Sequence, residues 1–531
     1  MPDAVVIGSG PNGLVAANLL ADQGWDVVVL EAQPAPGGAV RSSELIESGY
    51  VNDMFSAFYP LAVASPVFEA LDLPSHGLRW RRAPLALAHP SADGTCPVIS
   101  TDLDETASSL DELAAGDGAA WRRLFDQWQR VGPSLIEALC NPFPPVRAGM
   151  RLVAAQRPSE LLRFARFLTL PVRRLGEEEF TSDGARRLLA GTTLHTDLSP
   201  ESTLGATFGW LLASLAQDLG WPVPEGGAGE LTAALVRRLE AAGGEVRCEM
   251  PVTEVVVRGG RAVAVRTAAA VEVEASRAVV ADVSAPALFL DLVAAEHLPA
   301  RMLDDVRRFH WDSATAKVDW TLDGPIPWTA EPARRAGTVH IGDTLDALSM
   351  QSAQLAVGMV PDPLFILLGQ QNLADPTRQP DGKATAWAYT HVPRHVRGDA
   401  GDDAITGCWD ERETVAIADR MEKEVERLAP GFKSLIRGRH IFSPLGLEAA
   451  NANLARGATN GGTAQLHQQL VFRPSPGLGR PETPVAGLFL GSSSAHPGGG
   501  VHGACGANAA KAAIWADRLN RGRRQWKRWL Y

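Results

Sequence analysis

Residues Asp3–Ala32 read DAVVIGSGPNGLVAANLLADQGWDVVVLEA, and this stretch decides the fold. Ala4–Ile7 is a short apolar run of the kind that forms a buried parallel strand, and Leu14–Ala21 is expected to be a helix. The turn that joins them fits the pattern G-x-G-x-x-G, with glycines at Gly8, Gly10 and Gly13. Such a turn lets backbone approach a bound group closely and leaves the N–H groups of the helix N-terminus free to bind an anion.

A second apolar strand, Asp26–Leu30, follows the helix and ends in the acidic residue Glu31. In a strand–helix–strand unit of this kind, the pyrophosphate of a dinucleotide lies at the helix N-terminus, and the acid accepts hydrogen bonds from the ribose hydroxyls. Strand, glycine turn, helix, second strand and acid occur here in that order. The sequence therefore predicts a dinucleotide site in an α/β domain rather than a glycine-rich turn without a ligand.

The segment after Glu31 carries two further motifs, the glycine pair Gly37–Gly38 and the stretch GYVND at Gly49–Asp53. They match the "GG" turn and the "G-[FY]-x-x-D" segment that follow the ribose acid in the FAD-dependent amine oxidase and phytoene desaturase superfamily, which this chain resembles. One position departs from that pattern, because the family often has Arg directly after the glycine pair and this chain has Ala39. Arg41 is expected to make the phosphate contact instead.

Two later segments extend the resemblance. Val252 begins a hairpin that in the family returns the chain to the FAD domain, and the resemblance implies that its backbone contacts adenine. Near the C-terminus, Gly487–Leu490 is expected to be a strand that leads through Gly491–Ser492 into HPGGGVHGACGANAA. In the family this strand–loop–helix passes beneath the flavin, which implies that Gly500 and Val501 lie at the ring and that a helix begins there.

The resemblance covers nearly the whole chain, and the form of the late glycine loop is that of the desaturase-like branch. It implies an α/β fold with a discontinuous Rossmann-type FAD-binding domain, made of residues 1–75, 220–290 and 480–531. Residues 76–219 and 291–479 would form a mixed α+β substrate domain with a helical subregion. Since no second G-x-G-x-x-G occurs between a strand and a helix, we expect electrons to pass from the flavin to dioxygen or a quinone rather than to a nicotinamide.

Candidate catalytic residues lie in the expected strand SATAKVDWTL and in the late glycine loop. The resemblance implies that Lys317 holds a water near flavin N5, and the alternative is an exposed strand lysine. His496 and His502 flank the glycine loop, where either could move a proton, brace the turn or cap the following helix. His195 and Asp197 are candidates for facing the substrate or for holding a loop.

Composition and charge exclude several other functions. A formal charge of −11 disfavours a nucleic-acid partner, and five cysteines without a C-x-x-C pair indicate neither a disulfide framework nor a metal site. We expect the FAD to be non-covalent, because Cys505 does not match the family's cysteinyl attachment position. The absence of a long apolar run argues against a membrane span and for a cytoplasmic protein.

Two basic segments predict peripheral contact with the inner face of a membrane. Residues 144–176 hold seven arginines among apolar residues and are expected to form a basic amphipathic helix. The tail at residues 521–531 has similar chemistry, with Trp526 and Trp529 among cations. In either segment, arginines that merely cover apolar core are the alternative.

These observations predict an FAD-dependent oxidoreductase that removes a hydride from a C–H bond of a lipophilic, isoprenoid-like or polyene-like substrate and forms a double bond. The main alternative is an amine oxidase that gives an imine. Amine-oxidase pockets generally carry an aromatic pair that faces the flavin, and a total of four tyrosines counts mildly against that arrangement. A flavin-bearing binding or assembly protein, or an isomerase without net redox turnover, is the third hypothesis.

Overall fold

The computed structural model describes residues 1–529, and its side chains through residue 519. A five-stranded parallel sheet, the first sheet, has the strand order β21-β13-β1-β2-β9. Its strands are β1 (Ala4–Ile7), β2 (Val27–Leu30), β9 (Glu245–Arg247), β13 (Ala278–Ala281) and β21 (Leu488–Leu490). These strands come from three distant parts of the chain, and the loops that follow them meet at one edge of the sheet. The expected α/β fold is confirmed, and the domain boundaries at residues 75, 219, 290 and 479 stay a prediction.

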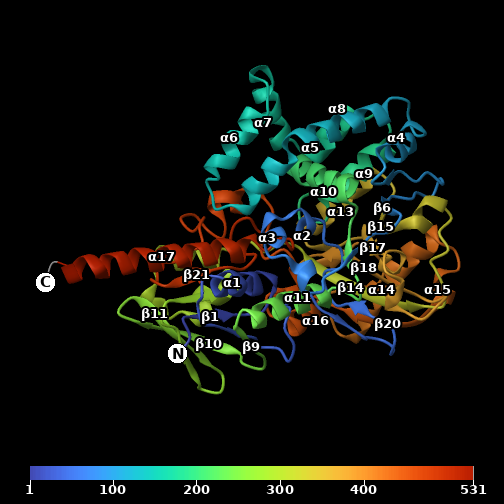
Figure 1. The fold of residues 1–531 in the computed structure, drawn as a ribbon. Helices are drawn as coiled ribbons and strands as arrows, with labels where there is room; N and C mark the ends of the chain where they lie inside the picture. Colours follow the sequence, from blue (N-terminus) through green and yellow to red (C-terminus); the bar gives the residue numbers. More distant parts are fainter. Residues whose placement is uncertain (530–531) are drawn as a thin grey trace.

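Different layers cover the two faces of the first sheet. Side chains alternate along its strands, so that Ala4 and Val6 pack under helices while Val5 and Ile7 pack under a small antiparallel sheet. The helices are α1 (Pro11–Ala21), α11 (Gly229–Ala241) and α17 (Ala504–Trp529), and Figure 1 shows α17 running beside α1. The small sheet consists of β10 (Val252–Arg258), β11 (Arg261–Thr267) and β12 (Glu272–Glu274).

The second sheet has seven strands in the order β20-β14-β18-β17-β15-β6-β7 and is antiparallel except where β15 pairs with β6. Its strands are β6 (Leu85–Ala88), β7 (Val98–Ile99), β14 (Ala314–Leu322), β15 (Ala336–Ile341), β17 (Ile366–Gly369), β18 (Ala384–Val392) and β20 (Ile436–Phe442). On β14, alternate residues such as Ala316 and Val318 pack in a core with α14 (Glu411–Leu428) and α15 (Phe432–Leu435). The residues between them, including Lys317, therefore lie on the opposite face.

A helical region stands above the second sheet and has its own core. It contains α4 (Leu103–Asp111), α5 (Asp117–Cys140), α6 (Val146–Ala154), α7 (Leu161–Thr169), α8 (Val172–Glu179), α9 (Asp183–Thr193), α10 (Gly205–Leu219) and α13 (Leu345–Ala356). The connecting regions add α2 (Pro60–Ala64), α3 (Pro66–Ala70), α12 (Ala300–Arg307), α16 (Pro444–Ala450) and the short strand pairs β3 (Ser42–Ser43) with β4 (Asn52–Asp53), β5 (Trp80–Arg81) with β8 (Val223–Pro224), and β16 (Met359–Val360) with β19 (Gly398–Asp399). Figure 1 shows α6 and α7 projecting from the rest of the molecule.

Several expected boundaries differ from the structure. The expectation of one basic helix over residues 144–176 is wrong: the segment forms α6, α7 and part of α8, because Pro158 and Pro171 interrupt helical hydrogen bonding. The first helix begins at Pro11 rather than Leu14, since proline suits the first turn. The late helix begins at Ala504. No helix among residues 1–529 combines the length and hydrophobicity that a bilayer span needs.

The crossing of α1 and α17 depends on a glycine. A Cβ built on Gly506 would lie 1.8 Å from the backbone oxygen of Asn12, so the two helices approach at van der Waals contact of their backbones. No side chain can move aside to relieve a clash with backbone.

We therefore expect Gly506→Ala to destabilise the protein by about 3 kcal/mol or more, because α17 must shift away from α1. Gly149→Ala is the control, since Gly149 lies in helix α6 with nothing within 4 Å of its built Cβ, and alanine there favours the helix. Thermal unfolding of both variants measures the difference. An unfolding midpoint of Gly506→Ala equal to that of the control would contradict this account of the helix crossing.

Candidate functional site

A cavity of about 900 Å³ lies between the carboxyl edge of the first sheet, the second sheet and the helical region. Its lining extends from the G-x-G-x-x-G turn to the side chains of α5 and α10. One continuous space thus has a polar end at the first sheet and an apolar end under the helices.

The first glycine turn forms the polar end. Gly8 has a φ of +90°, and a Cβ on it would lie 2.9 Å from the backbone oxygen of Asp282. A Cβ on Gly10 would lie 2.5 Å from the Asp282 carboxyl Oδ2. Both glycines line the cavity, whereas Gly13 packs behind it, where a Cβ would lie 2.2 Å from the Gly8 oxygen. Close packing within the protein therefore requires all three glycines, against backbone oxygens at Gly8 and Gly13 and against the Asp282 carboxyl at Gly10.

Glu31 lies at the end of β2 and faces the same space. Its carboxylate accepts hydrogen bonds from the Ser9 amide at 2.8 Å, the Ser9 hydroxyl at 2.6 Å and the Gln33 amide at 2.9 Å. Two carboxylate oxygens have about four lone-pair sites, so capacity remains for a ribose hydroxyl. Val252, the first residue of β10, lines this end as well.

Gly38 and Arg41 close over the glycine turn. A Cβ on Gly38 would lie 2.9 Å from the Gly10 Cα, and both Gly38 and Arg41 line the cavity. The Arg41 guanidinium donates to the backbone oxygens of Gly38 at 3.1 Å and Ala450 at 2.8 Å and lies over the Phe55 ring. Burial lowers the pKa of Arg41.

The late glycine loop lines the middle of the cavity, but two of the expected residues lie behind its surface. Gly491 packs against Val280 and Ala509, and the Ser492 hydroxyl accepts a hydrogen bond from the Ser494 amide at 3.3 Å. The lining from this loop comes instead from Ser493, His496, Pro497, Gly499, Gly500, Val501 and His502.

His496 and His502 both line the cavity, and both are held by backbone contacts. His496 Nε2 lies 3.1 Å from the Asn141 oxygen, and His502 Nδ1 accepts a hydrogen bond of 3.1 Å from the Ala504 amide at the start of α17. Burial lowers the pKa of each histidine to about 4, so both rings are neutral near pH 7. Cys505 is fully buried beside them.

Lys317 is buried and lines the cavity, so the alternative of an exposed strand lysine is wrong. Its ammonium donates to the Asp53 backbone oxygen at 3.0 Å and pairs with the Asp319 carboxylate. Burial raises the pKa of Asp319 to about 6 against the opposing effect of the lysine. Tyr389 is its cross-strand neighbour on β18 and also lines the cavity.

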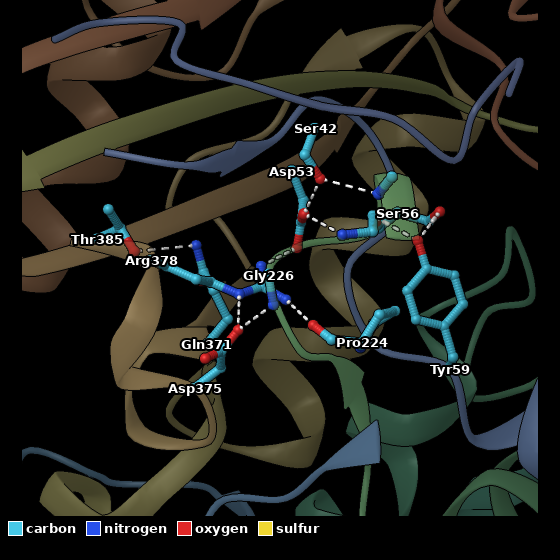
Figure 2. Close-up of polar contacts among 12 residues, drawn as sticks. Ser42, Asp53, Ser56, Tyr59, Pro224, Gly226, Gln371, Asp375, Arg378 and Thr385 are labelled. Carbon is cyan, nitrogen blue, oxygen red and sulfur yellow. Dashed lines mark hydrogen bonds and ion pairs between the residues drawn. The ribbon is translucent and has the colours of Figure 1, made fainter. Parts of the chain in front are cut away.

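Asp53, whose backbone oxygen accepts from Lys317, belongs to a buried ionic network with Arg378 and Asp375. Figure 2 shows this network. The Asp53 carboxylate accepts hydrogen bonds from Arg378 at 2.5 Å, the Ala228 amide at 2.7 Å and the Ser42 hydroxyl at 2.7 Å. Arg378 also pairs with Asp375 at 3.1 Å, and both side chains of the Asp53–Arg378 pair are completely buried. Sequence reasoning named Asp53 only within a motif and missed its partner, which lies 325 residues away with no local pattern to mark it.

Asp282 is the second residue that sequence reasoning missed. It follows β13, and its carboxyl accepts a hydrogen bond of 2.8 Å from the Gly13 amide at the start of α1. Burial and the nearby charge of Glu31 raise the pKa of Asp282 well above its usual range. The sequence could have identified Asp282, because it directly follows an apolar strand. A polar residue at the carboxyl end of a parallel strand lies at the edge of the sheet where ligands bind.

His195 and Asp197, which the sequence offers as candidates for facing the substrate or for holding a loop, have different roles. Asp197 holds a loop, since it accepts hydrogen bonds from the Thr463 hydroxyl and from the Ala464 amide at 2.8 Å. His195 lines the apolar end of the cavity and contacts His340.

The fold and the cavity define a flavin-dependent oxidoreductase, and the comparisons agree. A family model described as flavin containing amine oxidoreductase matches residues 12–345, and the chain belongs to this family. Pyridine nucleotide-disulfide oxidoreductase domain-containing protein 2 of Rattus norvegicus is 29% identical over 96% of this chain and 92% of its own length. Phytoene desaturase (neurosporene-forming) of Cereibacter sphaeroides is 24% identical over 97% of this chain and 94% of its own.

Among solved structures, an oxidoreductase from Methanosarcina mazei superposes with a TM-score of 0.61 at 15% identity, covering 96% of this chain and 99% of its own. At that identity the likeness supports the fold alone. FAD is the cofactor of this family and of this chain. The desaturase relatives support the desaturase-like branch of the superfamily.

The residues present fit FAD. The first glycine turn and the start of α1 line the polar end, where a pyrophosphate would lie, and Asn12 there has a buried side-chain oxygen without a partner among the described residues. The Glu31 carboxylate has spare capacity for a ribose hydroxyl. Of the residues that line the cavity, Gly8, Gly10, Glu31, Gly38, Arg41 and Val252 would hold the nucleotide part of FAD, and Gly500 and Val501 would lie at its ring.

The Asp282 carboxyl beside α1 predicts a pH-dependent affinity for FAD. An ionised carboxylate there repels the pyrophosphate, so binding must keep Asp282 protonated, and affinity falls as pH rises through the raised pKa. We expect the FAD affinity of flavin-stripped protein to weaken about tenfold or more over the pH range in which Asp282 loses its proton, because the new negative charge opposes the pyrophosphate.

In Asp282→Asn this pH dependence should largely disappear, because the amide is neutral and still accepts from Gly13. Fluorescence titration with FAD measures both proteins, and Asp3→Asn serves as a surface carboxyl control. An unchanged slope of affinity against pH in Asp282→Asn would show that another group carries the effect.

Proposed function

We propose that this protein is an FAD-dependent dehydrogenase that removes a hydride from a C–H bond of a lipophilic, isoprenoid-like or polyene-like substrate and leaves a double bond. The apolar end of the cavity carries this proposal. Its wall from the helical region bears no charged side chain among the described lining residues, which are Leu135, Ile136, Leu139, Cys140, Leu168, His195, Thr196, Leu204, Thr207, Phe208, Leu211 and Leu212.

Burial of a substrate methylene against such a wall contributes about 0.8 kcal/mol. A chain of several isoprene units therefore gains enough from burial to bind without an ionic contact. A cationic polyamine would find no counter-charge there among the described lining residues.

When bound, FAD supplies the hydride acceptor, flavin N5. The apolar wall excludes water and holds the C–H bond in place. Lys317 is held by the Asp53 backbone oxygen and by Asp319, which lies on the same face of β14 as Lys317.

The other hydrogen of the substrate leaves as a proton. We assign His496 to accept it, because its Nε2 donates to the Asn141 oxygen and its Nδ1, which has no hydrogen-bond partner among the described residues, therefore carries a free lone pair beside the cavity. His502 Nδ1 accepts from the Ala504 amide, so its Nε2 carries the ring proton and can donate to a group in the cavity.

Dioxygen or a quinone is the proposed electron acceptor, since residues 1–529 contain no second glycine turn of the nucleotide-binding type between a strand and a helix. Reoxidation by a small diffusible acceptor requires no further domain.

An amine oxidase is the second candidate function, and one observation favours it. Trp387 and Tyr389 on β18 stack with centroids 5.9 Å apart and planes at 13°, beside Lys317. Amine-oxidase pockets generally carry an aromatic pair that faces the flavin, and of these two rings Tyr389 is the one that lines the cavity. The uncharged apolar wall favours the dehydrogenase.

Anaerobic reduction of the enzyme-bound flavin distinguishes these functions. We expect phytoene or another polyene in detergent to bleach the flavin absorption band of the holoenzyme, whereas putrescine and benzylamine leave it unchanged. Detergent without lipid is the control. Bleaching by an amine but by no isoprenoid would establish the oxidase, and a flavin that no substrate reduces would favour the binding or isomerase role.

We further propose that α6 and α7 rest on an anionic membrane surface beside the apolar end of the cavity. Their exposed apolar side chains alternate with arginines on two short amphipathic helices that project from the molecule (Figure 1). Leu162 is 85% exposed and Met150 is 61% exposed. The side chains of the basic tail at 521–531, with Trp526 and Trp529, lie outside the described residues. A cytoplasmic location at the inner face of a membrane is part of this proposal.

Co-sedimentation with vesicles tests the membrane contact. We expect Met150→Glu with Leu162→Glu to lose several-fold in binding to phosphatidylglycerol-containing vesicles, because each glutamate opposes both the apolar and the electrostatic attraction. Met350→Glu is the matched control, since Met350 is 62% exposed on helix α13. Equal binding of the double variant and the control would place the contact elsewhere or exclude it.

A further inference from the structure

The apolar end of the cavity contains a pair of histidines that the proposed chemistry does not use. His195 follows α9 and lines the cavity, and its Nε2 lies 2.9 Å from Nε2 of His340, which is completely buried on β15. The edge of the His195 ring packs against Trp221 with centroids 5.0 Å apart. Two rings are thus joined by one hydrogen bond, and only one of them reaches the cavity.

Both rings are neutral near pH 7. Burial lowers the pKa of His195 to about 3, with a smaller effect from His391, and burial lowers that of His340 well below its usual range. Each neutral imidazole carries a single N–H, and one of the two N–H groups must lie between the paired Nε2 atoms.

The buried ring decides which histidine donates. His340 Nδ1 is buried and has no hydrogen-bond partner among the described residues. If His195 donated to His340, the His340 proton would sit on this Nδ1 and leave a buried N–H without an acceptor, which is rarer in proteins than an unpaired acceptor. His340 Nε2 therefore donates to His195, and the proton of His195 sits on Nδ1.

His195 Nδ1 has no hydrogen-bond partner in the described chain and is not among its buried unpaired atoms. Since the ring lines the cavity, this nitrogen is the one that the cavity can reach. The apolar end thus presents one N–H donor, fixed in its tautomer by a buried neighbour.

Two hydroxyls on the second sheet lie on the same side. His340, Leu367, Tyr389 and Lys317 are successive neighbours in one cross-strand row, and Tyr389 and Thr315 line the cavity. The Thr315 hydroxyl is buried and unpaired, and the Tyr389 hydroxyl makes no hydrogen bond within the described chain. At 4.7–4.9 Å per strand, His340 lies about 14 Å from Lys317 along this row.

We propose that the apolar end recognises an oxygen acceptor of the substrate, a carbonyl in particular, through His195 Nδ1–H, with the Tyr389 hydroxyl on the same face of the second sheet as His340. The substrate is then an oxygenated lipophile rather than a hydrocarbon. The oxygen lies remote from the C–H bond that reacts. This inference rests on the proposed function, because it names the class of lipophile that enters the same cavity. A pure hydrocarbon would bury the His195 N–H and the Tyr389 hydroxyl without partners, which costs more than the hydrogen bond itself contributes.

Binding of a matched pair of lipids to the holoenzyme tests this proposal. The probes are farnesylacetone, an isoprenoid ketone, and the hydrocarbon of the same skeleton with a methylene in place of the carbonyl. Titration under anaerobic conditions follows the perturbation of the flavin absorption spectrum. We expect the ketone to bind about tenfold or more tightly, and His195→Phe to remove this preference.

Two further variants separate recognition from packing. His195→Asn places an amide N–H near the position of Nδ1 and should restore part of the preference, and His395→Phe, at an exposed histidine, should leave it intact. A ketone that binds no better than the hydrocarbon, including no binding of either, overturns the proposal. So does a preference that survives in His195→Phe.

The position of the proton on the His195 ring can be measured directly, and it tests whether Nδ1 is the donor that faces the cavity. In holoenzyme labelled with ¹⁵N-histidine, we expect the His195 signals, identified by their loss in His195→Asn, to show a proton on Nδ1 from pH 5 to pH 8. A proton on Nε2 would contradict the proposal. If isoprenoids reduce the flavin but show no carbonyl preference, this inference alone fails; if no lipophile reduces it, the proposed function fails as well.

Discussion

The completely buried ion pair between Asp53 and Arg378 connects the parts of this structure that matter for its chemistry. Asp53 belongs to the N-terminal segment, its carboxylate caps the Ala228 amide before α11, and Arg378 belongs to the second sheet's connections. The Asp53 backbone oxygen then holds Lys317. Removal of one partner from a pair this deeply buried typically costs about 3–5 kcal/mol, because the other charge remains uncompensated. The relative position of the nucleotide end and the lysine depends on this contact.

Neutral polar groups are a second feature of the cavity. The histidines that line it, His195, His496 and His502, all have pKa values lowered by burial, and Asp282 has a raised one. Each burial effect disfavours a charge. The apolar end of the cavity would therefore orient a substrate by hydrogen bonds and apolar contact rather than by ionic attraction, which suits a lipophilic substrate and the hydride transfer that FAD supports.

Local patterns predicted the parts of the site that lie within short segments. The turn at Gly8 and Gly10, the acid Glu31 and the loop around Gly500 each depend on backbone geometry that a few residues encode, and all line one cavity. Lys317 could be singled out because a charged residue interrupts an apolar strand, and the structure shows that its side chain is buried rather than exposed.

Other features were beyond the reach of local patterns. The pairings of Asp53 with Arg378 and of His195 with His340 join residues 325 and 145 positions apart, so they depend on how the two sheets and the helices pack. The same limit applies to Gly491, whose glycine is required by packing against Ala509 rather than by a ligand. The prediction of a single basic helix was wrong because it followed the pattern of arginines and apolar residues and neglected the prolines, which interrupt the helix in the structure.

The central claim is that three distant segments hold one flavin. Hydrogen–deuterium exchange of the flavin-stripped and FAD-loaded protein tests it most directly. We predict that FAD slows exchange together at the first glycine turn, around Val252 and in the late loop around Gly500. Protection confined to the first glycine turn, with an unchanged late loop, would contradict the account.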